Sequence, residues 1–179
     1  MRKVIHKCFF VWNFDKEEKW LCDMASKGFA LVGVGFCRYE FENCDPGEYD
    51  VRLQLLNDRP NHPESQHYIS FIEETGAEHV GSYRKWVYFR KKTSDGAFEL
   101  FSDFESRIKQ LNRIILMIIF LVAANLYIGV FNLLLLFFNN SEVNSLGFIN
   151  MALGLIGSFG IWRLLKKRKK LRNDNKIFE

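Results

Sequence analysis

An uncharged run of 25 residues, from Ile114 to Phe138, limits what this chain can fold into more than any other feature. As an α-helix the run would be about 37 Å long, enough to cross a hydrocarbon core of roughly 30 Å with some tilt. A core helix in a soluble protein of 179 residues is rarely apolar on every side over such a length. The sequence therefore predicts a transmembrane helix over residues 114–138.

A second apolar segment, over residues 146–165, predicts a second span after a polar outside loop at 139–145. A basic cytoplasmic tail is predicted over residues 166–179. Counted from Arg163 to the end, the chain has eight Lys and Arg residues, whereas the loop has none. By the positive-inside rule, we expect a multi-pass protein of the cell membrane with both termini cytoplasmic. The basic cluster either only sets this topology or also binds anionic lipid headgroups. Its members are Lys166, Lys167, Arg168, Lys169 and Lys170.

The net charge of +4 is unevenly distributed along the chain. Residues 1–92 carry 14 Lys+Arg and 14 Asp+Glu, whereas residues 93–179 carry 11 and 7. The basic balance therefore belongs to the membrane-flanking region, and we expect no nucleic-acid partner. All four cysteines lie before residue 45 without CxxC spacing. In a cytoplasmic domain, they are expected to be reduced thiols.

Residues 1–92 show the alternating patterns of a small α+β domain. Strands are predicted over 2–11, 29–41, 48–56 and 77–92, and helices over about 15–27 and 64–75. Asp45-Pro46-Gly47 predicts a tight turn that joins the second and third strands as a hairpin. The two halves resemble each other at an offset of 48 residues, with Gly28 matching Gly76. This β-α-β-β-α-β order predicts a ferredoxin-like cytoplasmic domain.

Residues 93–113 are predicted as a linker and a juxtamembrane amphipathic helix, continuous with the first span from about residue 97 to residue 138. A stripe at heptad spacing runs along this helix and continues into the membrane through two asparagines and a glycine. Its partner is either the second span of the same chain or the same helix of a second chain. The heptad extends below the membrane, which favours a homodimer. The predicted packing residues are Phe101, Phe104, Ile108, Leu111, Asn125, Gly129 and Asn132.

The free face of the predicted sheet is the candidate binding surface. Strand alternation there predicts outward-facing arginines and aromatic side chains, with Tyr49, Leu53 and Phe89 packed inside. Because the domain is neutral, a protein partner or a dimer is favoured over RNA, and an ordinary amphipathic sheet is the alternative. The predicted partner-binding residues are Arg38, Arg52, Trp86, Tyr88 and Arg90.

No motif in the sequence predicts catalysis or a bound cofactor. No nucleophile arrangement or phosphate-binding glycine loop is present, and His62 and His67 lack the paired spacing of a structural metal site. We therefore expect a protein that is not an enzyme, with no cofactor and no metal site.

Three stretches carry a family resemblance: WNFDKEEKWLCDMASKGF from Trp12, PGEYDVRL from Pro46 and KWVYFRKK from Lys85. Over residues 5–92 the chain resembles an uncharacterised bacterial family catalogued as domain of unknown function 2812. The resemblance implies a small cytoplasmic domain, often followed by membrane helices, and a link to a PadR-type regulator; it implies no activity. Our leading hypothesis is a membrane-anchored sensory or regulatory module that acts through protein contacts. The alternative is a ligand-binding or accessory subunit of a larger membrane complex, such as a transporter.

Overall fold

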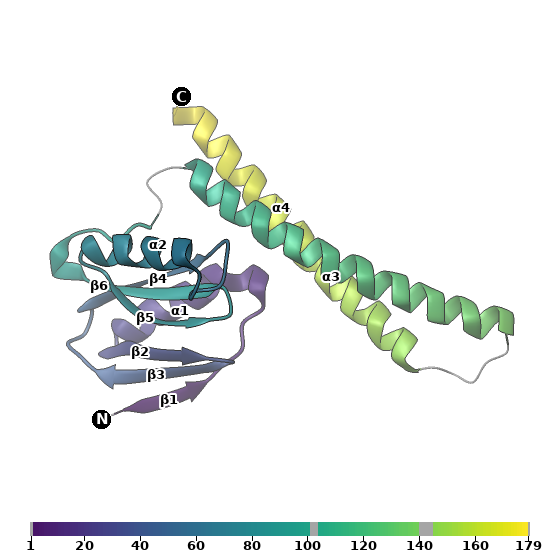
Figure 1. Cartoon of the computed structure of the whole chain (residues 1–179), viewed down its shortest axis with the longest axis horizontal. Helices are drawn as coiled ribbons and strands as arrows, with labels where there is room; N and C mark the ends of the chain where they lie inside the picture. The colour runs from purple at the N-terminus through teal and green to yellow at the C-terminus, as the bar shows by residue number, and fades with distance from the viewer. Residues whose placement is uncertain (1, 101–103, 140–144, 179) are drawn as a thin grey trace. The chain divides into compact units, whose positions relative to one another are not determined.

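A computed structural model of the chain describes residues 2–100, 104–139 and 145–178 (Figure 1). It divides into two compact units, Met1–Ser102 and Asp103–Glu179. The described part of the first unit is built of β1 (Lys3–His6), η1 (Val11–Asn13), α1 (Phe14–Ala25), β2 (Phe29–Gly35), β3 (Arg38–Asn43), β4 (Tyr49–Leu55), α2 (Pro63–Glu74), β5 (Glu78–Tyr83), β6 (Trp86–Lys92) and η2 (Thr93–Asp95). The second unit is built of α3 (Phe104–Asn139) and α4 (Ser145–Phe178).

The strands of the first unit form two three-stranded antiparallel sheets, with the orders β1-β3-β2 and β4-β6-β5. An α+β domain is therefore confirmed, but the ferredoxin-like β-α-β-β-α-β order is wrong. The observed order is β-α-β-β followed by β-α-β-β. The expected hairpin between the second and third predicted strands is also wrong, because β3 and β4 belong to different sheets.

Two tight turns explain why the sequence suggested too few strands. The predicted strands over 29–41 and 77–92 each fold back on themselves, at Phe36-Cys37 and at Arg84-Lys85. Cys37 has φ 49° and Arg84 has φ 57°, a left-handed conformation that is uncommon for residues other than glycine, asparagine and aspartate. Two-residue hairpin loops are usually recognised in a sequence by Asn-Gly or Asp-Gly, and neither pair stands at these two turns.

The two β-α-β-β units are structural copies of one another at the predicted offset. Gly28 and Gly76 both follow a helix with positive φ, 83° and 85°. The register of β2 on β3 shifts just before Gly33, and that of β5 on β6 shifts just before Gly81. Corresponding helix ends and bulges thus fall at corresponding residues, which indicates an internal repeat.

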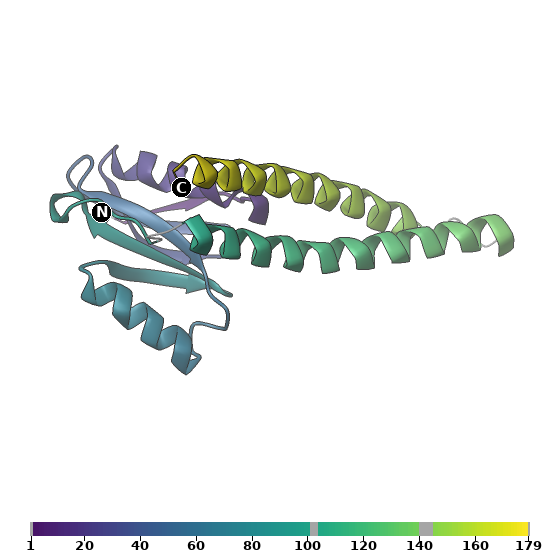
Figure 2. The same ribbon diagram turned by 90° about the horizontal axis from the view of Figure 1, so that it is seen from above.

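The sheets meet where β2 lies beside β5: a Cβ added at Gly81 would stand 3.2 Å from Cγ2 of Val34. Helix α1 lies on one side of the strands and α2 on the other (Figure 2). Leu21 and Met24 of α1 share one core cluster with residues of both sheets, including Phe41 and Leu53.

The second core cluster lies between α2 and the outer side of β6. Because side chains alternate along a strand, Val87 and Phe89 pack in this cluster, whereas Tyr88 packs with α1. Phe98 is also buried in the second cluster. The first unit therefore extends beyond Lys92, where the sequence placed its end.

In the second unit, α3 and α4 lie side by side as an antiparallel pair (Figure 1). Both are long and apolar enough to span a membrane. Small residues bring their backbones together: a Cβ at Gly129 would lie 3.0 Å from the backbone nitrogen of Met151, and one at Gly147 would lie 2.9 Å from Cβ of Asn132. Glycines at helix contacts permit this close approach.

The predicted packing stripe is used within the chain. Leu111 is buried, and the stripe continues through Gly129 and Asn132 at the contact with α4. Within the chain, the stripe therefore faces α4, while the homodimer that the heptad favoured stays a prediction. Asn125 and Asn132 donate their side-chain N–H groups to carbonyls one turn back in their own helix, 2.8 Å away.

The beginning of this long helix differs from the prediction. Helix α3 begins at Phe104 rather than near residue 97, since residues 93–95 form η2 and residues 96–100 are not helical. Ile108 lies half-buried in its early turns. Phe101 lies outside the described residues, as do residues 140–144 of the predicted outside loop.

Replacing Gly129 should weaken the α3–α4 contact. Gly129→Ala places a methyl group against the Met151 backbone, which cannot move without separating the helices, and we expect a loss of about 1–3 kcal/mol. Gly154→Ala should cost less, because its nearest neighbour is the flexible side chain of Leu126. Thermal unfolding in detergent, followed by the helical circular dichroism signal, measures both. An unchanged midpoint for Gly129→Ala would contradict the close contact.

Candidate functional site

A buried carboxylate joins the two sheets of the first unit. Glu17 lies on α1 and is 9 % exposed. Its Oε1 accepts hydrogen bonds from the hydroxyls of Tyr39 on β3 and Tyr88 on β6, both at 2.7 Å. The three side chains come from three elements and link α1 to both sheets at one point.

Burial raises the pKa of each of the three groups in this cluster. Desolvation raises the pKa of Glu17, and the two tyrosine hydrogen bonds oppose that rise. Burial and the nearby Glu17 carboxylate raise the pKa of Tyr39 and Tyr88, so both hydroxyls remain donors at neutral pH. A catalytic acid or base must reach a proton of its substrate. Glu17 is enclosed and makes both bonds internally, so we assign it to holding the sheets together.

Glu17 was not among the site residues predicted from the sequence, although its spacing along α1 pointed to the core. Glu17, Leu21 and Met24 lie at positions i, i+4 and i+7, on the stripe of α1 that faces the core. A carboxylate on such a stripe needs hydrogen-bond donors, and the donors lie far away in sequence.

Arg90 forms a second polar junction between the sheets. Its Nε donates to Glu78 at 2.7 Å, and its Nη1 donates to the Leu31 carbonyl at 3.1 Å and to Glu42 at 3.2 Å. The guanidinium also lies 4.6 Å from the ring centre of Tyr49. Arg90 therefore binds residues of four other strands, and its Nε and Nη1 donors are used within the unit.

The predicted partner-binding residues do not share one surface. Tyr88 is buried in the core, and Trp86 packs against that core and against Phe14 at 5.7 Å. Arg52 is half-buried, donates to the Val51 carbonyl at 2.9 Å and lies over the ring of Phe98. With Arg90 engaged as above, Arg38 alone among the five is classed as exposed. The prediction of one free sheet face was wrong, because α1 packs against both sheets and α2 packs against the other side of β6.

The open surface is the outer face of β1 and β3. Val4 lies opposite Glu40 and His6 lies opposite Arg38 in the antiparallel ladder. Val4, His6 and Arg38 are exposed, and Arg38 pairs with Glu40 at 2.9 Å. We call these four residues the β1–β3 patch. It presents an apolar group, an imidazole ring and a surface ion pair on a regular strand backbone.

The cysteines differ from the expectation of four thiols. Cys8 and Cys37 are joined by a disulfide, with their Cα atoms 4.6 Å apart. The pairing of β1 with β3 explains this, because it brings the end of β1 beside the β2–β3 turn. Cys22 and Cys44 are free. Burial raises the pKa of the Cys22 thiol, which keeps it protonated and unreactive.

One group of side chains has the composition of a weak cation site. Asp58, His62 and Glu64 each offer a ligand atom, and these atoms lie within 4.8 Å of one another. His62 and Glu64 are exposed. Exposed carboxylates gather in this way without a metal, and we assign none here. His67, the other histidine of this region in the sequence analysis, is exposed on α2.

The basic cluster lies on the C-terminal half of α4. Nζ of Lys166 lies 5.6 Å from the ring centre of Trp162, and Arg168 donates to Asn112 of α3 at 3.0 Å. Lys169 and Lys170 are exposed, and Lys167 is half-buried. Arg168 thus ties α4 to α3, whereas Lys169 and Lys170 extend the charge into solvent.

The model of a family described as protein of unknown function (DUF2812) matches residues 13–123. The chain belongs to this family. No curated protein and no solved structure matches the chain. The matched region begins beside α1 and ends within α3, so the DUF2812 region includes nearly all of the first unit and the first half of α3.

Glu17 should give the DUF2812 domain a specific pH dependence. Its pKa is raised in the folded state, so the folded chain binds this proton more tightly than the unfolded chain does. The free energy of unfolding should then fall as pH rises from the usual Glu value of 4.5 through the folded pKa. Glu17→Gln keeps an oxygen acceptor for both tyrosines but does not titrate, so this part of the slope should vanish.

Urea unfolding followed by tryptophan fluorescence, between pH 4.5 and neutral pH, measures this effect. The matched control is Glu73→Gln, which changes an exposed carboxylate on α2 and should keep the wild-type slope. Identical pH profiles for wild type and Glu17→Gln would contradict the assignment.

Proposed function

We propose that this DUF2812 protein is a membrane-anchored, non-enzymatic regulatory module whose first unit acts through protein contacts. The observation that carries the anchor is the outer surface of the helical pair. Phe120, Tyr127, Phe138 and Leu155 are all well exposed there, with Tyr127 at 72 %. Apolar surface of this extent is costly in water and favourable in lipid.

We place both termini in the cytoplasm and the loop between the helices outside. The support is the Lys and Arg asymmetry between the tail and the loop. Disulfides are rare in the cytoplasm. In that compartment we expect Cys8 and Cys37 to be mainly reduced, as thiols that β-strand pairing keeps close together.

The β1–β3 patch supports a role in protein contact. The carboxylate of buried Glu17 and the Nε and Nη1 groups of Arg90 are used inside the unit. The patch combines exposed Val4 with His6 and the Arg38–Glu40 pair. An exposed strand pair with mixed polar and apolar side chains fits a protein surface of complementary charge.

Arg38→Glu should reduce association without unfolding the domain. Arg38 is exposed and its ion pair lies at the surface, so the free energy of unfolding should change by at most about 1 kcal/mol. Trp86→Ala should instead destabilise the domain, by roughly 2–4 kcal/mol, because Trp86 packs on the core. Chemical unfolding of the full chain measures both changes.

Association is measured with a photo-crosslinking amino acid at His6 in cells. We expect a discrete protein adduct that weakens when Arg38→Glu is added, with Arg59→Glu as the exposed control outside the patch. An adduct of twice the 21.1 kDa chain mass would identify a second copy. The absence of any protein adduct at His6 would rule out the patch as the contact surface.

The proposed orientation of the chain in the membrane can be tested by cysteine labelling. In a chain without native cysteines, a single cysteine replaces Ser141 or Lys170, and intact cells are treated with a membrane-impermeant thiol reagent. We expect labelling at Ser141 only, because the basic tail is held inside. After lysis both positions should react. Labelling at Lys170 but not at Ser141 in intact cells would reverse the proposed orientation.

A further inference from the structure

Two of the three large exposed aromatic side chains among residues 2–100, Phe10 and Phe36, lie at one end of the sheets. Among residues 2–100, the large exposed apolar residues are Val4, Phe10, Val11, Phe36 and Phe71. Three of these five belong to the β1–α1 loop and the β2–β3 turn. Phe10 stacks on Trp12 at 4.7 Å, and Phe36 lies 5.8 Å from Tyr83 beside the β5–β6 turn.

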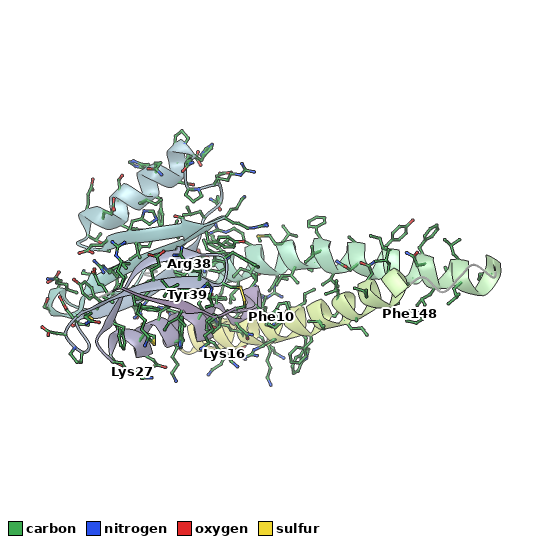
Figure 3. The ribbon with its side chains drawn as sticks, turned by 90° about the horizontal axis from the view of Figure 1, so that it is seen from below. Phe10, Lys16, Lys27, Arg38, Tyr39 and Phe148 are labelled. Carbon is green, nitrogen blue, oxygen red and sulfur yellow. A yellow bond between two sulfur atoms is a disulfide. The ribbon has the colours of Figure 1, made fainter. Side chains whose placement is uncertain are left out.

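We define the aromatic end as residues 7–13, 36–38 and 83–85, three segments that the strands bring to the same end. Strand β1 ends opposite the start of β3, since His6 pairs with Arg38. The Phe36–Tyr83 contact joins the two hairpin turns. Phe10 of this end and Lys27, which lies in the turn after α1, are at opposite ends of the unit (Figure 3).

The aromatic end is also the basic end of a neutral domain. Its three segments contain Lys7, Arg38, Arg84 and Lys85 and no acidic residue. Arg38 pairs with Glu40, and Lys85 donates to the Asn57 carbonyl. Lys7 lies over the rings of Phe9 and Trp20, at 4.9 and 4.4 Å from their centres. Positive charge is thus concentrated beside the exposed rings.

The segments are held in place before any partner binds. The backbone N–H of Lys7 donates to the Cys37 carbonyl at 3.0 Å, and the Cys8–Cys37 disulfide links the same two segments. The hydrogen bond and the strand pairing do not depend on the disulfide, so the arrangement does not require oxidised cysteines. Little conformational freedom is left to lose on binding, which favours even a weak interaction.

From these observations we propose that the aromatic end docks on the surface of an anionic bilayer, with Phe10 and Phe36 entering the headgroup region. Aromatic rings are favoured at the membrane interface, and Lys and Arg beside them attract anionic headgroups. The proposal rests on the proposed membrane anchor. An anchored domain remains at high effective concentration near the bilayer, so four basic residues and a few rings suffice.

The test uses the full chain reconstituted in vesicles of phosphatidylcholine and phosphatidylglycerol at a ratio of about 7:3, a charge density at which basic residues are attracted to the surface. Benzoylphenylalanine replaces Phe10, Phe36, Phe71 or Tyr127 in separate variants, and adducts formed under light are identified by mass spectrometry. Phe71 is the matched control, because it is 56 % exposed, close to the 59 % of Phe10, but lies on α2.

We expect lipid adducts at positions 10 and 36 to exceed those at position 71 by about fivefold or more. Phosphatidylcholine alone, or Lys7→Gln combined with Arg84→Asn, should lower them several-fold. Asparagine is chosen at position 84 because it tolerates the positive φ there. Lys27→Gln, at the opposite end, should change nothing.

The outcomes at Tyr127 separate this proposal from the proposed anchor. Lipid adducts at Tyr127, with yields at positions 10 and 36 no higher than at position 71, would leave the anchor intact and overturn the docking. Protein adducts in place of lipid adducts at positions 10 and 36 would also overturn it, in favour of a protein partner. No lipid adduct at Tyr127 would overturn the anchor and the docking together.

Discussion

The two hydrogen bonds to Glu17 are the interaction on which the first unit depends. Each sheet has only three strands and cannot bury both of its faces alone. Helix α1 packs against both sheets, and Glu17 binds one tyrosine from each. A buried carboxylate is costly unless donors satisfy it, so this contact favours one relative placement of the sheets over slipped alternatives. Arg90 acts similarly where β6 faces β2 and β3. The internal repeat supplies the two halves, and these two unrepeated polar residues join them.

The sequence predicted features governed by local chemistry. Gly28 and Gly76 end their helices, and Asp45-Pro46-Gly47 turns with Gly47 at φ 78°. The two apolar helices followed from a run without charge, and the match of Gly28 with Gly76 revealed the repeat. The strand number was wrong because Cys37 and Arg84 adopt left-handed conformations that their residue types do not announce. Each unrecognised turn joins two strands that were predicted as one, β2 with β3 and β5 with β6. The four predicted strands then fitted a ferredoxin-like order.

The site residues were harder to predict for a related reason. Alternation along a strand indicates which residues share a face, but it does not indicate what covers that face. Trp86, Tyr88 and Arg90 were correctly placed together, yet the face they share packs against α1 and the first sheet. Arg38 lies on an open face, since it is exposed together with Val4 and His6 among the residues that the structure describes. The partners of Glu17 and Arg90 lie across the repeat, so no local pattern could have named them.

The family match covers parts of both structural units. It includes the repeated domain except for β1 and continues to residue 123, well into α3, but it leaves out α4. The glycines of α4 that approach α3, Gly147, Gly154 and Gly157, therefore lie outside the matched region, whereas Val122 and the buried Leu111 lie inside it. The match thus joins most of the repeated domain to the first half of one apolar helix. In this chain, α4 covers the stripe of α3 that contains Gly129 and Asn132, and glycines at the contact permit the close approach of the two helices.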